Sequence, residues 1–409
     1  MRDKKLVIAL LGTGFGWGGG VDFLRNIANA LLEMKKQHDL SVYLLLPEVD
    51  FIASPLDLLR MVRNTVRDSL KSKKLSLALP RLAFGNLFAD FPINVQGEVT
   101  ILSFQDTPRG LLRCLKRIGA SVVFPVKRSL GDTYPIPWIG WIPDFQHKYY
   151  PKNFDARECF ARDTTIADVL RDAKAVIVYS VALRNDINRF FPYTQAQIIT
   201  LPFSPIAVPE WYDDENHVVK EYCLPERYFL LSNQFWIHKD HLTAFRALLK
   251  IAEVCDVSIV CTGHLKDYRR AGYAEELKIF LSANKLERRV QLLGHIPKRD
   301  QIEIMKRSLG VLQPTLFEGS PGGMSVCDAV SMGIPVIMSD IEVNREVQAD
   351  NVFLFKAGDN EDLADKMTDL LGLKLTPPSK DILIRSAQES AERLGDALIT
   401  AIEHVVKRV

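Results

Sequence analysis

The sequence predicts an α/β protein with two doubly wound domains that face a central cleft. Three observations support this prediction. Short apolar stretches alternate with helical patterns along most of the chain, a proline-rich stretch interrupts them near the middle, and 409 residues are too many for one ordinary core. Apolar strands that alternate with helices form parallel sheets covered on both faces, so we expect one such sheet in each half.

The first domain is expected over residues 1–205. Its strand candidates are KLVIALLG, LSVYLLLP, EVTILSF, ASVVFPV, WIGWIP and AKAVIVYS. The stretch VDFLRNIANALLEMKK has apolar residues at helical spacing. The charged start MRDKK resembles the beginning of a signal peptide, but a glycine-rich turn replaces the cleavage site, so we expect a first strand there.

Residues 206–227 are expected to link the domains. The surrounding stretch, PFSPIAVPEWYDDENHVVKEYCLPER, contains four prolines and no sustained period. The second domain is expected over residues 228–380, with strand candidates YFLLSNQFW, VSIVCTG, VQLLGHIP, LGVLQPTLF, IPVIMSD and NVFLFKAG. Residues 381–409 form a strongly helical C-terminus, which we expect to cross back to the first domain.

Composition and charge argue against several classes of protein. A net charge of +2 gives no reason to expect nucleic-acid binding. No apolar stretch approaches the roughly 18 residues that a membrane span needs. The six cysteines are scattered without a C-x-x-C pair, which argues against a zinc site and fits free thiols in a reducing cytoplasm. We therefore expect a cytoplasmic protein with no metal ion and no cofactor.

One segment suggests contact with a membrane surface. Residues 55–74, within SPLDLLRMVRNTVRDSLKSKK, place leucine and valine on one helical face and arginine and lysine on the other. A basic amphipathic helix can lie on an anionic membrane, where lipid-linked acceptors would be found. Packing of the same helix against its own domain is the alternative.

The glycine-rich loop GTGFGWGGGVD follows the first strand candidate and precedes a helix. It contains the dinucleotide pattern G-x-G-x-x-G at Gly14, Gly16 and Gly19, but the nearest suitable acid, Glu48, comes 29 residues after Gly19. The pattern asks for roughly 20. An NAD-dependent oxidoreductase therefore remains an alternative. Glycines let backbone N–H groups approach an anion at a helix N-terminus, although a simple tight turn has the same composition.

The stretch WIPDFQHKYYP places Asp144 and His147 just after an aromatic strand candidate. A carboxylate and an imidazole at this end of the sheet can contact a sugar hydroxyl or handle a proton, so both are catalytic candidates. For Asp144, a structural cap of the following turn is the alternative.

The stretch LLSNQFWIHKDHLTAF forms the first strand-to-helix turn of the second domain. Lys239 lies where the helix should begin, so its ammonium and the helix dipole point to the same place, which suits a phosphate. An exposed lysine near a helix start is the alternative. His238 and His241 do not predict a metal site, because no third ligand lies at a recognisable spacing.

Two acids flank a glycine-rich turn in PTLFEGSPGGMSVCDAVSMGIPVIMSD. Glu318 ends a strand candidate, and Asp328 falls at the start of an expected helix, VCDAVSMG. A helix N-terminus favours a nearby carboxylate, which accounts for Asp328 but not for Glu318. Two acids on either side of a nest of amides can bind hydroxyls on both sides of a diphosphate. A sugar nucleotide has this layout.

The phrase at residues 314–347, PTLFEGSPGGMSVCDAVSMGIPVIMSDIEVNREV, resembles the E-x7-E motif of retaining nucleotide-sugar glycosyltransferases with the GT-B fold, the group 1 or family 4 glycosyltransferases. The resemblance is firm over residues 228–347 and looser before them. It implies transfer of a sugar to a glycan or lipid-linked acceptor, as in bacterial surface polysaccharide assembly. No D-x-D motif lies in a plausible place, so no metal is expected. An epimerase with this fold and a catalytically silent binding protein are alternatives.

The resemblance also assigns roles to single residues. Glu318 would contact hydroxyls of the donor sugar, Asp328 would bind the ribose hydroxyls, and Lys239 would bind the diphosphate. The other donor-binding candidates lie in loops that face the phosphates, the sugar or the base: Gly18, Gly19, His295, Ile296, Gly323, Met324 and Ser325.

This chain departs from the family pattern in four places. The two acids are ten positions apart, two more than in the pattern, and the second is Asp rather than Glu. Asn233 and Gln234 replace the usual Gly-Arg before the lysine, which leaves one phosphate-facing cation fewer. Pro143 and Asp144 replace the usual His-Asp, so His147 is the candidate for the missing imidazole.

Overall fold

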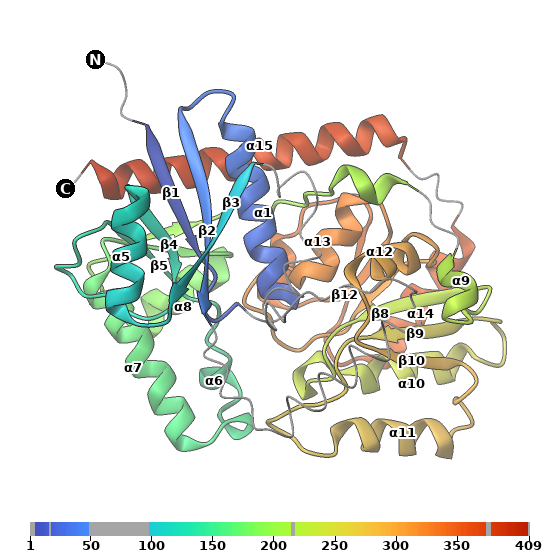
Figure 1. Ribbon diagram of the computed structural model, residues 1–409. Coiled ribbons are helices and arrows are strands. Elements are labelled where there is room, and N and C mark those ends of the chain that lie inside the picture. The colour runs from blue at the N-terminus through green and yellow to red at the C-terminus, as the bar shows by residue number, and fades with distance from the viewer. Residues whose placement is uncertain (1–4, 16–17, 49–97, 214–216, 374–377, 408–409) are drawn as a thin grey trace, which may run out of the picture.

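The computed structural model describes residues 5–15, 18–48, 98–213, 217–373 and 378–407. Within these residues the chain forms two parallel sheets, each covered by helices on both faces (Figure 1), which confirms the predicted fold class. The predicted amphipathic segment 55–74 lies outside the described residues.

The described part of the first sheet has the strand order β3-β2-β1-β4-β5-β6-β7, and every pairing is parallel. Its strands are β1 Leu6–Leu11, β2 Leu40–Glu48, β3 Val99–Gln105, β4 Val122–Val126, β5 Trp138–Trp141, β6 Ala175–Val178 and β7 Gln197–Thr200. Strand β7, a short edge strand with one exposed and three partly buried residues, was not predicted from the sequence.

The described part of the second sheet has the order β10-β9-β8-β11-β12-β13, again entirely parallel. Its strands are β8 Tyr228–Ser232, β9 Ser258–Thr262, β10 Val290–Gly294, β11 Val311–Gln313, β12 Val336–Ser339 and β13 Val352–Phe355. The strand order reverses between β1 and β4 in the first sheet and between β8 and β11 in the second. Ligands of doubly wound sheets bind at such points.

The helices connect the strands and cover the sheets. In the first domain they are α1 Gly18–Met34, α5 Pro108–Ile118, α6 Gln146–Tyr149, α7 Ala156–Asp172 and α8 Val181–Phe190. In the linker and second domain they are α9 His217–Glu221, α10 His241–Ile251, α11 Tyr273–Ala283, α12 Lys298–Lys306, α13 Gly323–Ser331, α14 Asn360–Gly372 and α15 Lys380–Val406. Among the described residues there are also four short 3₁₀ helices, labelled η: η1 Pro151–Asn153, η2 Pro209–Tyr212, η3 Ile237–Lys239 and η4 Glu342–Glu346.

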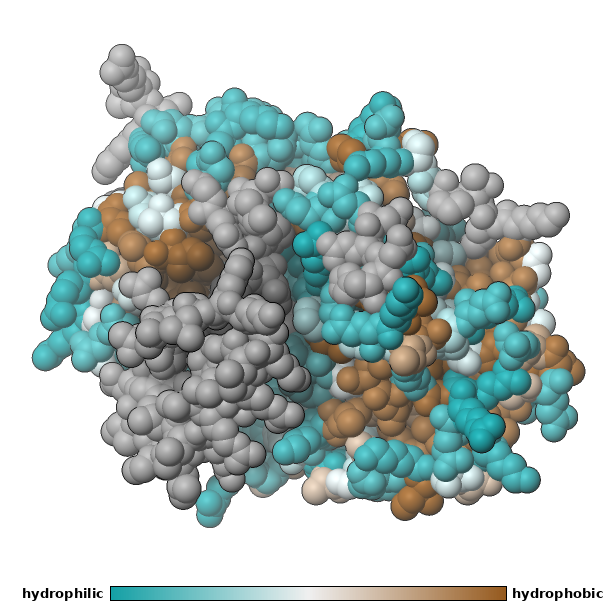
Figure 2. Space-filling view, turned by 45° about the vertical axis from the view of Figure 1, so that its right-hand side comes forward, coloured by the Kyte–Doolittle hydropathy of each residue, from teal (hydrophilic) through white to brown (hydrophobic). Residues whose placement is uncertain are grey.

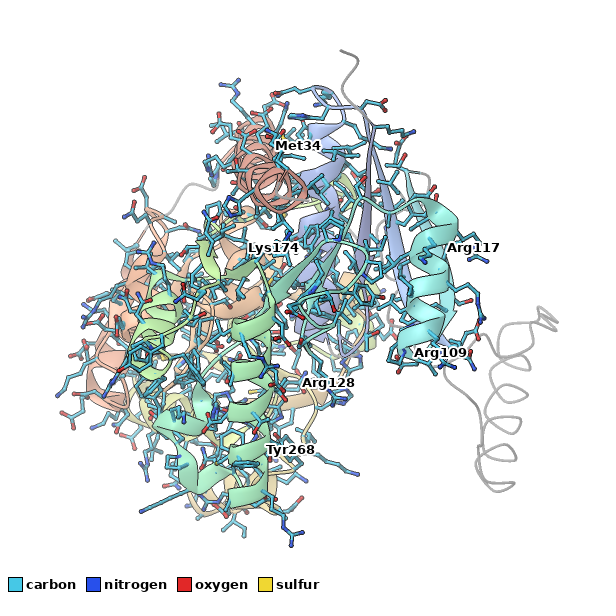
Figure 3. All side chains as sticks on the ribbon, turned by 90° about the vertical axis from the view of Figure 1, so that its left-hand side faces the viewer. Met34, Arg109, Arg117, Arg128, Lys174 and Tyr268 are labelled. Carbon is cyan, nitrogen blue, oxygen red and sulfur yellow. The ribbon has the colours of Figure 1, made fainter. Side chains whose placement is uncertain are left out.

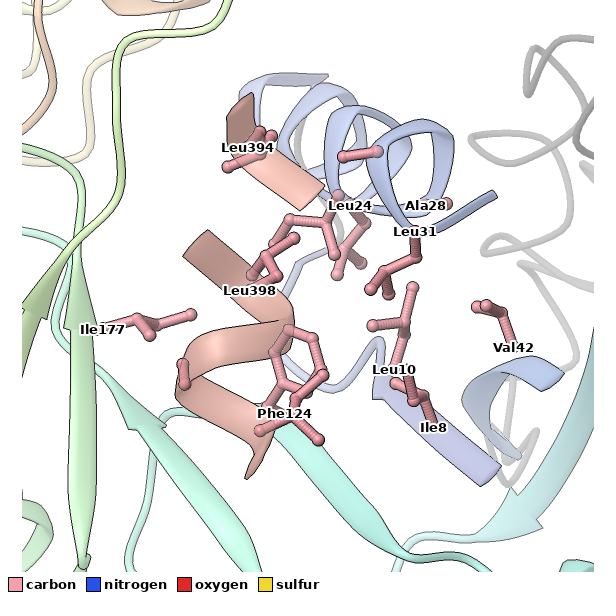
Figure 4. Packing of buried hydrophobic residues seen from close by; sticks show 14 of the residues in the cluster. Ile8, Leu10, Leu24, Ala28, Leu31, Val42, Phe124, Ile177, Leu394 and Leu398 are labelled. Atoms are coloured by element: carbon pink, nitrogen blue, oxygen red, sulfur yellow. The ribbon is translucent and has the colours of Figure 1, made fainter. Parts of the chain in front are cut away.

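Alternate side chains of β1 pack into two different hydrophobic cores, one on each face of the sheet. Ile8 and Leu10 pack with apolar side chains of α1 and α15 (Figure 4), whereas Ala9 and Leu11 face the core under α5, α7 and α8. Successive side chains of a strand point to opposite faces, so a strand covered on both faces must be apolar throughout. The uninterrupted apolar run LVIALL follows from this arrangement.

Helix α15 crosses from the second domain to the first (Figure 1) and packs along α1, as the sequence analysis predicted. The two helices approach closely at Gly395, where a Cβ atom would lie only 2.6 Å from Cγ of Met34 (labelled in Figure 3). The core of the first domain is therefore completed by the C-terminal end of the chain.

In the described part of the chain, no helix has both the length and the apolar character to cross a membrane. On the face shown in Figure 2, hydrophilic side chains are interspersed with hydrophobic ones. All six cysteines are unpaired.

Candidate active site

A cavity of about 470 Å³ lies between the two domains and is lined by residues of both. The first domain contributes the start of α1 and the turns that follow β5 and β6. The second domain contributes the turns that follow β8, β9, β10 and β11, together with the start of α13. Most of the predicted site residues line this cavity: Gly19, Asp144, Asn233, Gln234, Lys239, His295, Ile296, Glu318, Gly323, Met324, Ser325 and Asp328.

Glu318 and Lys239 form an ion pair in the wall of the cavity. Lys239 Nζ donates to Glu318 Oε1, and each side chain is 11% exposed. The last residue of β11, Gln313, donates from Nε2 to the same carboxylate oxygen at 3.1 Å and to the carbonyl of Gly322 at 2.7 Å. Asn233 in turn donates its amide to Gln313 Oε1. The carboxylate is thus held in place by Gln313 at the end of β11 and by Lys239 in the turn that follows β8.

Helix α13 begins at Gly323, three residues earlier than the sequence analysis expected. Gly322 and Gly323 have φ angles of 62° and 71°, a left-handed conformation that glycine adopts without strain. The first backbone N–H groups of a helix have no partner within it, so this helix start offers donors beside Lys239. Asp328 lies in the second turn, which removes the helix start as an explanation for that acid.

Asp328 belongs to a ring of four charges that joins the domains. Arg25 donates to Asp22 at 2.7 Å and lies 3.5 Å from Asp328, and Lys298 donates to Asp22 at 2.8 Å and to Asp328. Burial acts to raise the pKa of Asp22, but Arg25 and Lys298 lower it overall. Burial raises the pKa of Asp328, although Lys298 opposes the rise. The Asp328 side chain is only 2% exposed, so its predicted role at the ribose stays a prediction.

The other three members of this ring and Gln313 were not predicted from the sequence. A signal was present for Asp22 and Arg25, because an acid and a base three positions apart follow the glycine-rich loop at the cleft end of α1. Gln313 is a polar residue that ends an otherwise apolar strand. Its position marks a side chain that faces the cavity and not the core.

Asp144 lines the cavity and also has the structural role considered as its alternative. Its Oδ1 accepts a hydrogen bond of 2.9 Å from the backbone N–H of Gln146, which closes the turn into α6. Arg162 of α7 lies 3.9 Å from the same oxygen. The other carboxylate oxygen, Oδ2, takes no part in this turn, so Asp144 can close the turn and still contact a ligand in the cavity.

The expectation that His147 faces the cleft is wrong. The short helix α6 turns its ring toward α7, where Nε2 lies 2.9 Å from Asp163 Oδ1, and the side chain is 1% exposed. Phe145 and Phe154 pack beside it. His147 therefore anchors the turn behind the cavity wall and is not among the residues that line the cavity.

The remaining candidates have varied settings. Gln234 Oε1 accepts from the backbone N–H of His264 at 3.0 Å, so this residue holds the loop after β9. His295 stacks on His264 with ring centroids 4.4 Å apart, and Ile296 is buried beside it. Gly18 is the first residue of α1. Where the described residues are concerned, no group of three or more potential metal ligands comes together.

The two domains are in direct contact on both sides of the cavity. Ser180 Oγ donates to the carbonyl of Gly319 at 3.2 Å. Tyr268, in the loop after β9, donates to Glu158 of α7 at 3.1 Å, and Figure 3 shows it beside that helix. Hydrogen bonds therefore join the two domains directly in this structure.

Replacement of Gly319 by alanine is expected to hinder closure. A Cβ atom there would lie 2.0 Å from the carbonyl oxygen of Pro143 and 2.9 Å from Cβ of Asp144, both in the other domain. We expect kcat/KM to fall roughly 100-fold, because displacements of about 1 Å can cost that much. Gly372→Ala, where a Cβ atom meets no other atom within 4 Å, is the control. Equal activity of both variants would contradict the prediction.

Two buried histidines beside Lys239 predict a pH-dependent stability. Burial, with a contribution from Lys239, lowers the pKa of His241 to about 3, and burial lowers that of His238 well below its usual range. Below pH 6.5 the unfolded chain binds a proton at His241, whereas the folded chain keeps His241 neutral until about pH 3. The contribution of His241 to the free energy of unfolding is therefore present above pH 6.5 and is lost as the pH falls toward 3. Between pH 6.5 and pH 5 the loss from His241 is about 2 kcal/mol.

Urea unfolding of the wild type and of His241→Phe at both pH values measures this loss. His241 stacks on Phe235 with ring centroids 4.1 Å apart, so phenylalanine preserves the packing. We expect the free energy of unfolding of the variant to fall by about 2 kcal/mol less than that of the wild type. An identical fall in both proteins would show that His241 does not titrate on unfolding.

Comparison with known proteins agrees with this fold. Residues 214–390 match the family model described as Glycosyl transferases group 1. No match to a curated protein was found by sequence comparison. A glycosyltransferase structure from Rickettsia africae is similar over 99% of this chain and 100% of its own, with a TM-score of 0.61 and 14% identity.

Two further structures share the fold. Anabaena HepE, in complex with UDP and glucose, is similar over 98% of this chain and 99% of its own, with a TM-score of 0.59 and 14% identity. A Listeria monocytogenes protein named as a UDP-N-acetylglucosamine 2-epimerase is similar over 99% of this chain and 98% of its own, with a TM-score of 0.52 and 13% identity. At these identities the likeness is one of fold, and proteins of more than one named activity share that fold.

Proposed function

We propose that this protein, whose residues 214–390 match the family model described as Glycosyl transferases group 1, transfers a sugar from a nucleoside diphosphate to an acceptor hydroxyl. One observation carries the proposal. The Glu318–Lys239 pair and the start of α13 meet in a cavity between the domains. This arrangement places side by side a carboxylate that can accept hydrogen bonds from sugar hydroxyls, a cation that can bind phosphate, and the backbone N–H groups of a helix N-terminus.

The ion pair suggests how the donor binds. Without a ligand, Lys239 and Glu318 neutralise each other. A diphosphate with its greater negative charge would attract Lys239, and the released carboxylate of Glu318 would accept hydrogen bonds from the sugar. Charge that develops on the leaving diphosphate would then be stabilised by Lys239 and the amides of α13, the kind of electrostatic effect that usually contributes most to catalysis.

We propose that transfer retains the anomeric configuration. The bond from the anomeric carbon to the phosphate oxygen breaks, and the bond to the acceptor oxygen forms on the same face. The acceptor proton passes to the departing phosphate, so neither Glu318 nor another carboxylate has to form a covalent bond. Asp144, at the first-domain side of the cavity, would orient the acceptor hydroxyl. His147 takes no part, because it does not reach the cavity.

The nature of the donor and acceptor extends the proposal. UDP-sugars are the first donors to test, because HepE of similar fold was solved with UDP and glucose. The resemblance at residues 314–347 supports a glycan or lipid-linked acceptor, metal-independent transfer and a role in bacterial surface polysaccharide assembly. Peripheral contact of residues 55–74 with the cytoplasmic face of a membrane belongs to the same proposal.

A thermal-shift panel of UDP-, GDP-, ADP- and dTDP-sugars, each with and without magnesium, and of NAD tests the proposed function. A ligand that binds the folded state raises Tm by mass action. We expect one nucleotide to stabilise the protein equally with and without magnesium, and the matching donor to lose its sugar slowly to water. Stabilisation by NAD alone would favour the oxidoreductase alternative, and conversion of the donor to its epimer would favour the epimerase.

A further inference from the structure

The ring of Asp22, Arg25, Lys298 and Asp328 combines two neutral pairs. Asp22 and Arg25 lie on α1 of the first domain, whereas Lys298 and Asp328 begin α12 and occupy the second turn of α13. Each domain therefore carries one acid and one base. The contacts between domains are Lys298 to Asp22 at 2.8 Å and Arg25 to Asp328 at 3.5 Å.

Burial of the ring is nearly complete. The side chains of Arg25 and Asp328 are 3% and 2% exposed, and those of Asp22 and Lys298 are 12% and 14% exposed. Trp211 belongs to the linker between the domains. Its ring centroid lies 4.7 Å from Cζ of Arg25 and 5.6 Å from Nζ of Lys298. All four charged side chains line the same cavity as Glu318 and Lys239. The ring thus connects the linker, both domains and the cavity.

The charge balance of this ring depends on whether the domains are closed. If they separate, each domain keeps its own neutral pair and water solvates both. When they close, the four charges sum to zero and can be buried together. Removal of one charge leaves the open state almost unaffected, because water screens the remaining partner, but it leaves an uncompensated charge in the closed state, which is costly.

We propose that Asp22 and Arg25 are positioning residues of the donor site, which couple donor binding to domain closure by completing a neutral ring with Lys298 and Asp328. They act through Asp328 and Lys298 and not by direct contact with the reacting atoms. The role of Asp22 and Arg25 depends on the proposed function only for the identity of the ligand, because domain closure can be measured without any ligand.

The test compares Arg25→Gln, Asp22→Asn and the double variant with the wild type. Each single variant buries one unpaired charge on closure, whereas the double variant keeps the neutral Lys298–Asp328 pair. Calorimetric titration with UDP, or with the nucleoside diphosphate that the panel identifies, should give a Kd about tenfold or more above wild type for each single variant. The double variant should return to within about threefold of wild type.

Asp22→Asn separates the proposal from simple attraction at a distance. Removal of an acid from a diphosphate site should strengthen binding if only the net charge matters, whereas the ring predicts weaker binding. Arg171→Gln, at an exposed pair with Asp168 on α7, is the matched control and should bind like the wild type. Binding by Asp22→Asn at least as tight as wild type, or no recovery in the double variant, would overturn the proposal.

Small-angle X-ray scattering without ligand keeps the test independent of the proposed function. We expect a larger radius of gyration for both single variants and a wild-type value for the double variant. If the wild type binds no nucleoside diphosphate, the proposed function fails, but this scattering result still supports the ring. Unchanged scattering in every variant would refute the closure device even if the donor binds.

Discussion

Replacement of Glu318 by glutamine or alanine is expected to lower kcat by about 100-fold or more while the fold survives. The carboxylate lies in the cavity wall and is held by Lys239 and Gln313, but it supports no part of either hydrophobic core. Its loss removes the acceptor of hydrogen bonds from the donor sugar and also leaves Lys239 without its partner. Steady-state kinetics with the donor found in the thermal-shift panel, together with circular dichroism, measures both effects.

A surface carboxylate provides the control for this variant. Glu361 pairs with Lys250 on the exposed side of the second domain and has a side chain that is 75% exposed. We expect Glu361→Gln to retain wild-type kcat. Unchanged turnover in Glu318→Gln would mean that the carboxylate does not act on the donor, and the assignment of this residue would have to be abandoned.

Replacement of Lys239 by alanine is expected to weaken binding of a nucleoside diphosphate by about 10- to 100-fold, since a hydrogen bond to a charged group contributes about 1.5–3 kcal/mol. Binding of the free nucleoside should change little, because Lys239 is proposed to contact only the phosphates. Calorimetric titration with both ligands gives the two ratios. The side chain is buried beside Glu318, so the variant also leaves an unpaired carboxylate next to the phosphate site.

The phosphate role of Lys239 is tested by whether Lys239→Ala weakens binding of the nucleoside diphosphate and not of the free nucleoside. Lys250→Ala, at the exposed pair with Glu361, should bind both ligands like the wild type. An equal loss of nucleoside and nucleoside diphosphate binding in Lys239→Ala would point to damage of the whole site and would reject the phosphate role.

The fold and part of the cavity lining could be predicted because the sequence patterns that indicate them are local. Glu318 follows β11, Lys239 precedes α10, and Asp144 follows β5, so each is placed at the carboxyl edge of its parallel sheet by its position in the chain. Apolar runs such as LVIALL reveal strands that are covered on both faces. Because the carboxyl ends of parallel strands lie together, these residues come close without any knowledge of side-chain packing.

The rest of the site depends on contacts between distant parts of the chain. Arg25 meets Asp328 across 303 positions, and this pairing follows from how α1 packs against α13, which no local pattern encodes. His147 shows the opposite case: its place after β5 was read correctly, but the direction of a one-turn helix decides whether a ring faces the cavity or α7. The start of α13 was placed three residues too late, because Gly322 and Gly323 were assigned to the turn, whereas Gly322 caps the helix and Gly323 is its first residue.

A crystal structure of the protein with the nucleoside diphosphate identified by the panel tests the central claim most directly. We expect the diphosphate within hydrogen-bond distance of Lys239 Nζ and the first amides of α13, with the sugar-bearing phosphate toward Glu318. A nucleotide bound outside the interdomain cavity, or one whose phosphates contact neither Lys239 nor α13, would contradict the account.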